Sequence, residues 1–311
     1  MIEIITAIAT VFILILLGSL LRIKSIPSDE YWLYADKLVY WILFPSFLFY
    51  KTSTITLTAE LLGPISQTLL AGMFISVIFA WSVSNWKNIQ SGACSSVVQG
   101  AGRHNTFIAL AVAESLFGEK GLMIATLSTA ILVPVTNLVI VVTLVIILNK
   151  GQQQMVRKIS GDLLRNPLLI SIFMGFVANL TGFRYIPVIH DATGLLGSAT
   201  LPIVLLCIGA SIQFAGLKQT LKPLLVSSIA KFIIFPGVVF TIVLLAEVPP
   251  EIAIILIIYA STPTAASGFA LARQMGGDYK LMASIISNQT LVSFITLPLT
   301  IYLAMKYLGL G

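Results

Sequence analysis

Ten stretches of this chain are each long and apolar enough to cross a lipid bilayer as a helix. A membrane-spanning helix needs about 20 predominantly apolar residues, because the hydrocarbon core of a bilayer is about 30 Å thick. Short polar segments separate the stretches, so each is expected to be an independent span. We predict spans over residues 2–21, 31–50, 62–83, 94–117, 121–148, 166–182, 188–213, 220–246, 250–274 and 279–308.

The composition excludes a soluble globular protein. Of the 311 residues, 58% are hydrophobic and only 10% are charged, whereas a soluble domain is about 25% charged. So few polar side chains cannot cover a surface that faces water. The chain is therefore predicted to be an all-α integral membrane protein.

The basic residues of the connections predict how the chain is oriented. With the N-terminus outside, eleven lysines and arginines fall in inner connections and four in outer ones. Cytoplasmic loops carry an excess of basic residues. We therefore predict a multi-pass protein of the bacterial cytoplasmic membrane, with both termini outside and the longest connection, 149–165, in the cytoplasm. The same bias accounts for the net charge of +6, so no nucleic-acid partner is inferred.

The sequence repeats itself once. AVAESLFGEKGLMIATLST (111–129) aligns with ALARQMGGDYKLMASIISN (270–288) at an offset of 159 residues, and the expected hinges Pro45 and Pro202 are 157 residues apart. Five spans repeated once make ten, and because five is odd the second copy is inverted in the membrane. Inverted repeats are typical of secondary transporters, whose site lies near the midplane where the repeats meet. We predict repeats over residues 1–148 and 166–311.

Two spans contain residues that should interrupt the helix at mid-depth. GAGRHN (100–105) contains Gly100 and Gly102, which lower helix stability, and ASTPTAASG (260–268) contains Pro263, which removes a backbone hydrogen bond. The two segments align under the repeat. Unwound backbone inside a bilayer is tolerated only where it is buried in protein or lines a wet cavity. We predict that the fourth and ninth spans are broken and bring their half-helix N-termini together.

The polar residues at the two breaks predict an anion-binding site. Helix N-termini carry partial positive charge and free N–H groups. Arg103 and His104 add to this field, and Asn105 offers hydrogen bonds that orient a carboxylate. The alternatives are an Arg103 that snorkels toward the cytoplasm and a His104 that is a hydrogen-bonded core residue. The candidate substrate-binding residues in the breaks are Arg103, His104, Asn105, Thr106, Thr262 and Thr264.

Other polar residues lie within spans near the breaks. Lys231 is in the middle of the eighth span, where a lysine costs about 3 kcal/mol on insertion scales. We interpret it as a coupling or structural cation; the alternatives are a deprotonated, carbonyl-bound or acid-paired lysine. Asn137, Asn288 and Gln289 are expected to satisfy the unwound backbone. The alternative for these three is ordinary hydrogen bonding between helices.

Three stretches resemble the auxin efflux carrier family: GRHNTFIALAVAESLFG (102–118), RNP (165–167) and STPTAASGFALARQMGGD (261–278). That family includes the plant auxin carriers and bacterial carriers linked to malonate or malate, and the resemblance covers the whole chain. It implies an elevator-type carrier and a homodimer. Spans 1, 2, 6 and 7 would form a scaffold, and spans 3–5 and 8–10 a transport domain. It also implies substrate contacts at Asn105 and, from the scaffold side, at Asn166.

The chain departs from the plant members in two places. Val112 stands where they have a proline, so the break in the fourth span depends on glycines. The third span also lacks the acid that plant members pair with a lysine in the eighth, the position of Lys231 here.

Together these features predict a secondary active transporter of small organic anions. The substrates considered are mono- or dicarboxylates such as malonate, malate or auxin-like acids, with H⁺, Na⁺ or no coupling ion left open. The alternatives are a sodium-coupled symporter of the bile-acid type and a cation/proton exchanger, which would need carboxylates at the crossing. Neither HExxH nor GxSxG occurs, so we predict no enzyme, no metal site and no cofactor.

Overall fold

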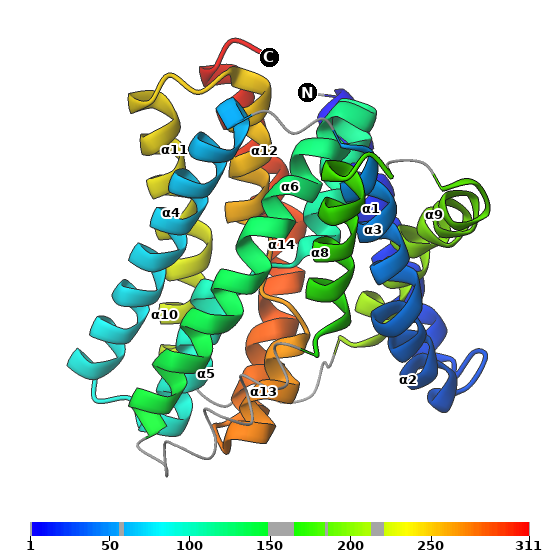
Figure 1. Cartoon of the computed structure of the whole chain (residues 1–311). Helices are drawn as coiled ribbons and strands as arrows, with labels where there is room; N and C mark the ends of the chain where they lie inside the picture. The colour runs from blue at the N-terminus through cyan, green and yellow to red at the C-terminus, as the bar shows by residue number, and fades with distance from the viewer. Residues whose placement is uncertain (1, 56–58, 149–164, 184–185, 213–220, 311) are drawn as a thin grey trace.

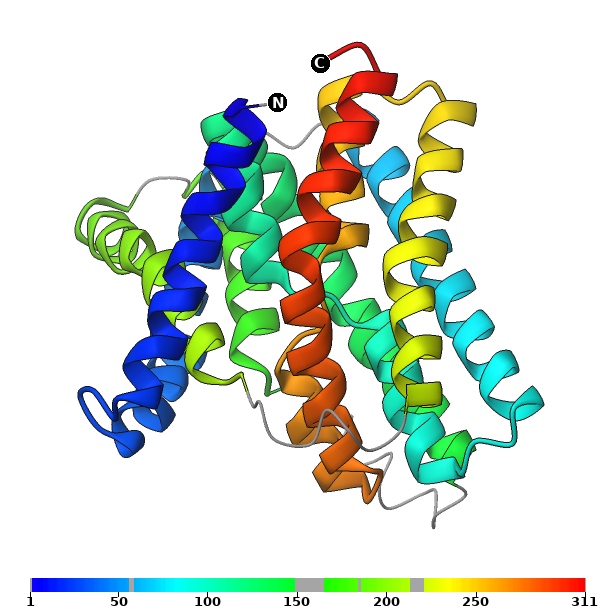
Figure 2. The same cartoon turned by 180° about the vertical axis from the view of Figure 1, so that it is seen from behind.

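The computed structural model describes residues 2–55, 59–148, 165–183, 186–212 and 221–310, and these form helices joined by turns, without a strand (Figure 1). Except for Arg165, the predicted cytoplasmic connection lies outside the described residues. The first helix and the last helix contact one another, and the chain begins and ends at the same end of the molecule (Figure 2).

Each predicted span coincides with a helix or a run of consecutive helices. The first half contains α1 (Ile2–Ile23), α2 (Asp29–Leu38), η1 (Val39–Leu43), α3 (Phe44–Thr54), α4 (Ala59–Trp86), α5 (Ser91–Gly102) and α6 (Thr106–Leu148). The second half contains α8 (Pro167–Leu180), α9 (Pro187–Ala210), α10 (Leu221–Ile229), η2 (Ala230–Ile234), α11 (Phe235–Leu245), α12 (Pro250–Ser261), α13 (Ser267–Met275) and α14 (Tyr279–Tyr307). Both η elements are single π-turns.

Six segments of the described chain are long and apolar enough to cross a membrane. They are Thr6–Ile23, Leu62–Trp86, Ser91–Leu148, Pro187–Ala210, Leu221–Leu245 and Tyr279–Tyr307. Ser91–Leu148 covers two predicted spans, because Gly118 (φ 57°) turns the chain inside α6. Two other predicted spans coincide with apolar helices that are shorter, Pro167–Leu180 and Pro250–Ser261. The chain is a multi-pass membrane protein.

Two helical runs widen into a π-turn directly before a Phe-Pro pair. Phe44 and Pro45 follow η1, and Phe235 and Pro236 follow η2. Proline has no N–H and its ring collides with the carbonyl of the preceding turn, so a wider turn relieves the helix. Because Lys231 is part of η2, the π-turn determines where this lysine lies.

The helices pack in two groups. In the first group, α3 packs along α8 and α9, and α1 packs along α9. The second group contains α4, α5, α6 and α10 to α14, whose packing centres on α5, α6, α12 and α14. In Figure 1 the first group lies mainly to the right and the second to the left. Contacts between the groups come mostly from α1 against α6 and α14, and from α6 against α3 and α9.

The first group is joined by backbone contacts at glycines. A Cβ on Gly18 would lie 2.0 Å from the carbonyl oxygen of Leu206, and one on Gly209 would lie 1.8 Å from that of Ile15. Small residues let membrane helices approach this closely. A larger residue at either position would push α1 and α9 apart.

The helix α12 lies at the centre of the second group. Every residue from Ala253 to Ser261 is buried. A helix that is apolar on all sides is expected to be surrounded by protein or lipid, and here protein surrounds it. The chain break that follows α12 is therefore deep inside the protein.

Candidate functional site

The two predicted interruptions are present, and both helices end with the same backbone geometry. The chain runs extended between α5 and α6 and again between α12 and α13. Arg103 (φ −75°, ψ 149°) and Thr262 (φ −69°, ψ 150°) are the first extended residues. These two residues are 159 positions apart, which is the offset of the sequence repeat.

The two breaks touch through their backbones. The N–H of Asn105 donates to the carbonyl of Pro263 at 2.7 Å. Both residues are buried. A direct hydrogen bond between two interrupted helices satisfies one donor and one acceptor that neither helix can satisfy itself. We refer to the two breaks together, residues 103–105 and 262–266, as the crossover.

Asn105 caps the helix that follows it. Its Oδ1 accepts hydrogen bonds from the N–H groups of Phe107 (3.1 Å) and Ile108 (3.2 Å). Asparagine is among the preferred N-cap residues for this reason. Its Nδ2 donates to no residue in the described chain, so the amide keeps a hydrogen-bond donor beside the α6 N-terminus.

Gln289 of α14 joins the two halves of the crossover. Its Oε1 accepts from the N–H of Thr264 at 3.0 Å, and its Nε2 donates to the carbonyl of Gly100 at 3.1 Å and to the hydroxyl of Ser227 at 3.0 Å. This side chain satisfies one backbone group from each broken helix. It therefore fixes the two breaks relative to one another.

The glycines before the first break serve close packing. Gly100 and Gly102 remain in the last turn of α5, and the extended residues follow them. A Cβ on Gly100 would lie 2.2 Å from the Ser227 hydroxyl, and one on Gly102 would lie 2.6 Å from a methyl of Val77. The interruption thus falls on the polar residues themselves, and the glycines let neighbouring helices approach it.

The Arg103 side chain joins the first break to two polar residues elsewhere in the second group, Ser267 and Asn137. Its Nη1 donates to the hydroxyl of Ser267, the first residue of α13, at 3.0 Å. Its Nη2 donates to Oδ1 of Asn137 at 3.2 Å. The residue is buried and does not snorkel out of the protein, and its Nε has no hydrogen-bond partner in the described chain.

Lys231 is fully buried near the same place. The hydroxyl of Ser76 lies 2.9 Å from the carbonyl of Ala230 and 3.2 Å from that of Ala101, so η2 is held against the end of α5. The Lys231 ammonium lies 4.5 Å from the centre of the Phe235 ring and has no hydrogen-bond partner in the described residues. No carboxylate there forms an ion pair with Lys231 or Arg103.

Buried polar atoms without partners gather in and next to the crossover. Both ring nitrogens of His104, both amide atoms of Gln99 and the hydroxyl of Ser261 are buried and form no hydrogen bond within the described chain. The His104 ring packs 5.8 Å from that of Tyr259. Nearly all buried polar groups in proteins are hydrogen-bonded, so this cluster marks the crossover as a candidate binding site.

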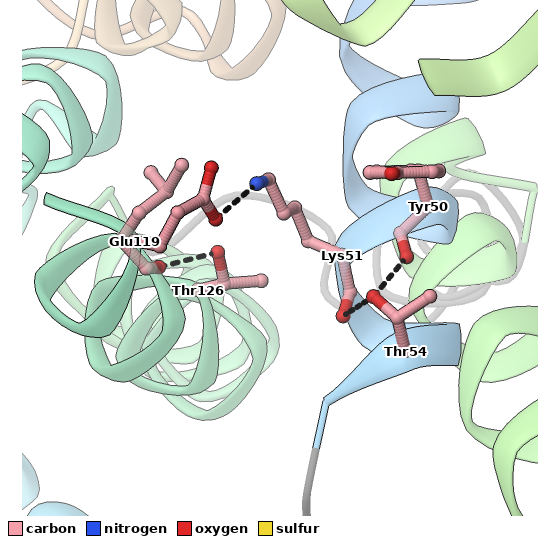
Figure 3. A network of polar contacts seen from close by, with 6 residues as sticks. Tyr50, Lys51, Thr54, Glu119 and Thr126 are labelled. Carbon is pink, nitrogen blue, oxygen red and sulfur yellow. Dashed lines mark hydrogen bonds and ion pairs between the residues drawn. The ribbon is translucent and has the colours of Figure 1, made fainter.

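A cavity of about 530 Å³ lies where α6 faces the first group. Its walls come from α1, α3, α6 and α9 and are mostly apolar, and none of its described lining residues belongs to the crossover. Its charged residues are Lys51, Glu114 and Glu119. Lys51 of α3 donates to Glu119 at 2.8 Å, and the two side chains point toward one another between the helices (Figure 3).

Comparison with known proteins identifies the kind of protein to which this geometry belongs. The chain matches the membrane transport protein family over residues 3–301. This is the family of the auxin efflux carriers. The chain belongs to this family.

Two archaeal relatives match nearly the whole carrier. An uncharacterized transporter from Methanocaldococcus jannaschii is 26% identical over 297 residues, covering 93% of this chain and 95% of the relative. An uncharacterized transporter from Methanothermobacter thermautotrophicus is 22% identical over 307 residues, with the same coverage. The chain is therefore a membrane transporter, and its buried crossover is a candidate site for the transported molecule.

The structure brings most of the predicted site residues of the transporter together. The two breaks contact one another, and Asn137 and Gln289 are hydrogen-bonded to them. The hydroxyls of Thr262 and Thr264 donate to the carbonyls of Tyr259 and Gln99, so these threonines satisfy backbone. Thr106 is buried as the first residue of α6.

Other predicted residues of the transporter lie apart from the crossover. Asn166 caps α8 by accepting from Leu168 N–H at 2.9 Å, and no contact in the described chain joins it to the breaks. Asn288 is half-buried, and no hydrogen bond joins its side chain to another described residue. Pro45 and Pro202 lie in α3 and α9 of the first group, and Pro202 lines the cavity.

Sequence reasoning missed several polar residues of the transporter. Gln99 and Ser261 directly precede the two breaks, and that position is a signal that would have found them. Lys51 is one of the four basic residues counted in the outer connections, and nothing in the sequence marked it as part of a site. Asn179 lies with its Nδ2 2.7–3.1 Å from three carbonyls at the end of α3, including that of Ile55, and no pattern in the sequence marks this role.

Proposed function

We propose that the chain is a secondary active transporter of small organic anions, with the anion's carboxylate bound at the crossover. The observation that carries the proposal is the burial of two cationic residues, Arg103 and Lys231, without an acidic partner in the described chain. A buried charge without a counter-charge is costly. An anionic cargo would supply the missing counter-charge and would be favoured for that reason.

The local geometry supports a carboxylate as the bound group. The N-termini of α6 and α13 both lie at the crossover, and helix N-termini favour anions. Asn105 keeps its Nδ2 as a donor, and Arg103 keeps its Nε. His104 and Gln99 offer further unpartnered polar atoms. Arg103, Asn105 and His104 are the residues that we propose touch the substrate, with Lys231 acting through its charge.

The packing supports alternating access by movement of one helix group against the other. The first group corresponds to the proposed scaffold of spans 1, 2, 6 and 7, and the second to the proposed transport domain of spans 3–5 and 8–10. The crossover lies entirely in the second group. The shared backbone geometry of Arg103 and Thr262, at the offset of 159 residues, supports the inverted repeat.

Sodium coupling and cation exchange are less well supported by the crossover. A sodium site in such a break would use free backbone carbonyls. The carbonyls of Gln99, Gly100 and Ala101, at the end of α5, all accept hydrogen bonds from neighbouring residues. A cation exchanger would need carboxylates, and the crossover contains none.

We further propose a homodimer in the cytoplasmic membrane, with both termini outside and residues 149–165 in the cytoplasm. The excess of basic residues in the inner connections supports this orientation. In the experiment that identifies the substrate, binding that requires sodium would favour sodium coupling, and binding that depends on pH would favour coupling to H⁺.

The test is binding of a carboxylate panel to purified protein, measured as a shift of the thermal unfolding midpoint. The panel contains malonate, malate, succinate and indole acetate, each with and without sodium at two pH values. We expect one acid to stabilise the wild type, and Asn105→Ala to weaken its binding by about tenfold, since charge-assisted hydrogen bonds contribute roughly 1.5–3 kcal/mol.

Asn288→Ala is the matched control for this test. It removes the same side chain from a half-buried position that is not hydrogen-bonded to the crossover, so it should bind the acid as the wild type does. Binding that survives in Asn105→Ala, or a panel in which no acid binds, would contradict the proposal.

A further inference from the structure

Glu119 and Lys120 are adjacent in the sequence but form ion pairs in opposite directions. Glu119 accepts from Lys51 of α3, which links the second helix group to the first across the cavity (Figure 3). Lys120 pairs with Glu251 at the start of α12, inside the second group. The turn at Gly118 therefore carries one ionic contact to each group.

The two partners of the first pair differ in how firmly they are held. The side chain of Lys51 is 18% exposed at the cavity wall, whereas that of Glu119 is 82% exposed. Exposed ion pairs contribute little to stability because water competes for both charges. Glu119 can therefore turn into solvent at small cost while Lys51 stays at the cavity.

We propose that Lys51 receives the anion that enters the cavity, and that the anion's carboxylate displaces Glu119 and releases the link between the two helix groups. This inference rests on the proposed function only in taking the cargo to be a carboxylate. The ligand's carboxylate forms an ion pair with the Lys51 ammonium, and the Glu119 side chain turns toward water. Glu114 lines the same cavity, so a second negative charge on the ligand is repelled there.

Lys51 shares one helix face with residues that lead toward the crossover. Phe44 and Phe47 lie seven and four residues before it on the same face of α3. The Phe47 ring lies 6.0 Å from that of Phe44, which lies 4.5 Å from Phe107 of α6. Phe107 N–H is held by Asn105. Loss of the Lys51–Glu119 link thus loosens the same interface at which Phe44 and Phe107 meet.

The cavity itself is suited to a small organic molecule. Its volume of about 530 Å³ falls within the range of about 300–1,000 Å³ that ligand pockets occupy. Its mostly apolar wall would hold the body of the acid while Lys51 holds its charged end.

The first experiment measures uptake of the acid into proteoliposomes by Lys51→Gln and by Lys51→Arg. The control is Lys120→Gln, which removes the same charge from the ion pair inside the second group. The KM should rise by about tenfold in Lys51→Gln, since a hydrogen bond to a charged group is lost, and stay near the wild-type value in Lys51→Arg and in the control. An unchanged KM in Lys51→Gln, or an equal rise in the control, overturns the proposal.

A second measurement uses no cargo. Ala111→Cys, in a background with Cys94 and Cys207 replaced by serine, places a buried thiol in the α6 wall of the cavity. Its reaction rate with a membrane-impermeant thiol reagent reports how open the cavity is. Glu119→Gln should raise this rate by about threefold, and the charge-swapped K51E/E119K should return it to the parent rate, as expected for two coupled residues.

The two measurements separate this inference from the proposed function. If no acid binds to the wild type while the thiol rates behave as expected, the anion proposal is wrong and the link between the groups stands. If an acid binds but Glu119→Gln leaves the thiol rate unchanged, the role of Lys51 and Glu119 is wrong and the anion proposal stands.

Discussion

The two breaks of the crossover have nearly the same backbone and very different side chains. Arg103 and Thr262 leave their helices with φ and ψ that agree within a few degrees. The first break continues with His104 and Asn105, and the second with Pro263 and Thr264. In the second break the polar groups are directed to backbone, whereas in the first several polar atoms have no partner among the described residues.

This difference suggests a division of labour between the halves. The second break supplies shape, through a proline and threonines that satisfy neighbouring backbone. The first break supplies charge and free hydrogen-bonding groups. A repeated fold keeps the geometry in both copies, and only one copy needs to carry the chemistry.

The largest expected effect comes from breaking the connection between the two halves. Gln289→Leu keeps the approximate volume but leaves the Thr264 N–H, the Gly100 carbonyl and the Ser227 hydroxyl without their partner. We expect the free energy of unfolding in detergent to fall by roughly 2–4 kcal/mol, because each buried group left unpaired costs about 1–3 kcal/mol. Asn288→Leu, one residue earlier, should change it little. Equal stability of Gln289→Leu and wild type would contradict the bridging role.

A smaller effect should come from neutralising the first break alone. Arg103→Gln removes the charge but keeps an amide that can donate. We expect the Kd for the transported acid to rise by about tenfold, equivalent to about 1.4 kcal/mol. Ser267→Ala, which removes the partner of Arg103 in the second half, should raise the Kd only slightly, because Arg103 keeps Asn137. A larger rise in the Kd from Ser267→Ala than from Arg103→Gln would contradict this division between the halves.

The smallest effect on binding should come from the charge that acts at a distance. Lys231→Met replaces a buried ammonium with an apolar chain of similar length. We expect the Kd to rise about threefold while unfolding becomes harder by about 1 kcal/mol, since a buried charge is often destabilising. Isothermal titration of this variant measures the change in Kd, and thermal unfolding measures the change in stability. An unchanged Kd would show that Lys231 does not contribute to binding of the acid.

The positions of the helices were predictable because a membrane imposes a length and a composition on each span. The presence of both breaks was predictable too, from Pro263 in the second and from Gly100 and Gly102 in the first, although the first interruption falls on Arg103 to Asn105 and the glycines stay helical. Both signals are local in the sequence.

The bonds that hold the site together are not local. Gln289 and Gly100 are 189 residues apart, and Lys51 and Glu119 are 68 apart. The sequence marked Gln289 only as a polar residue inside a span and Lys51 only as a basic residue of an outer connection. The reason for Gly100 also differs from the expected one, because the space available beside Ser227 depends on a helix from the other half.

The burial of α12 on all sides has a consequence for how the bilayer acts on this protein. At 12 residues the helix is about 18 Å long at 1.5 Å per residue, much shorter than a hydrocarbon core of about 30 Å. A lipid-facing helix of that length would suffer hydrophobic mismatch. Because α12 is surrounded by protein, no mismatch arises there, and a change in membrane thickness reaches the crossover only through the longer helices around it.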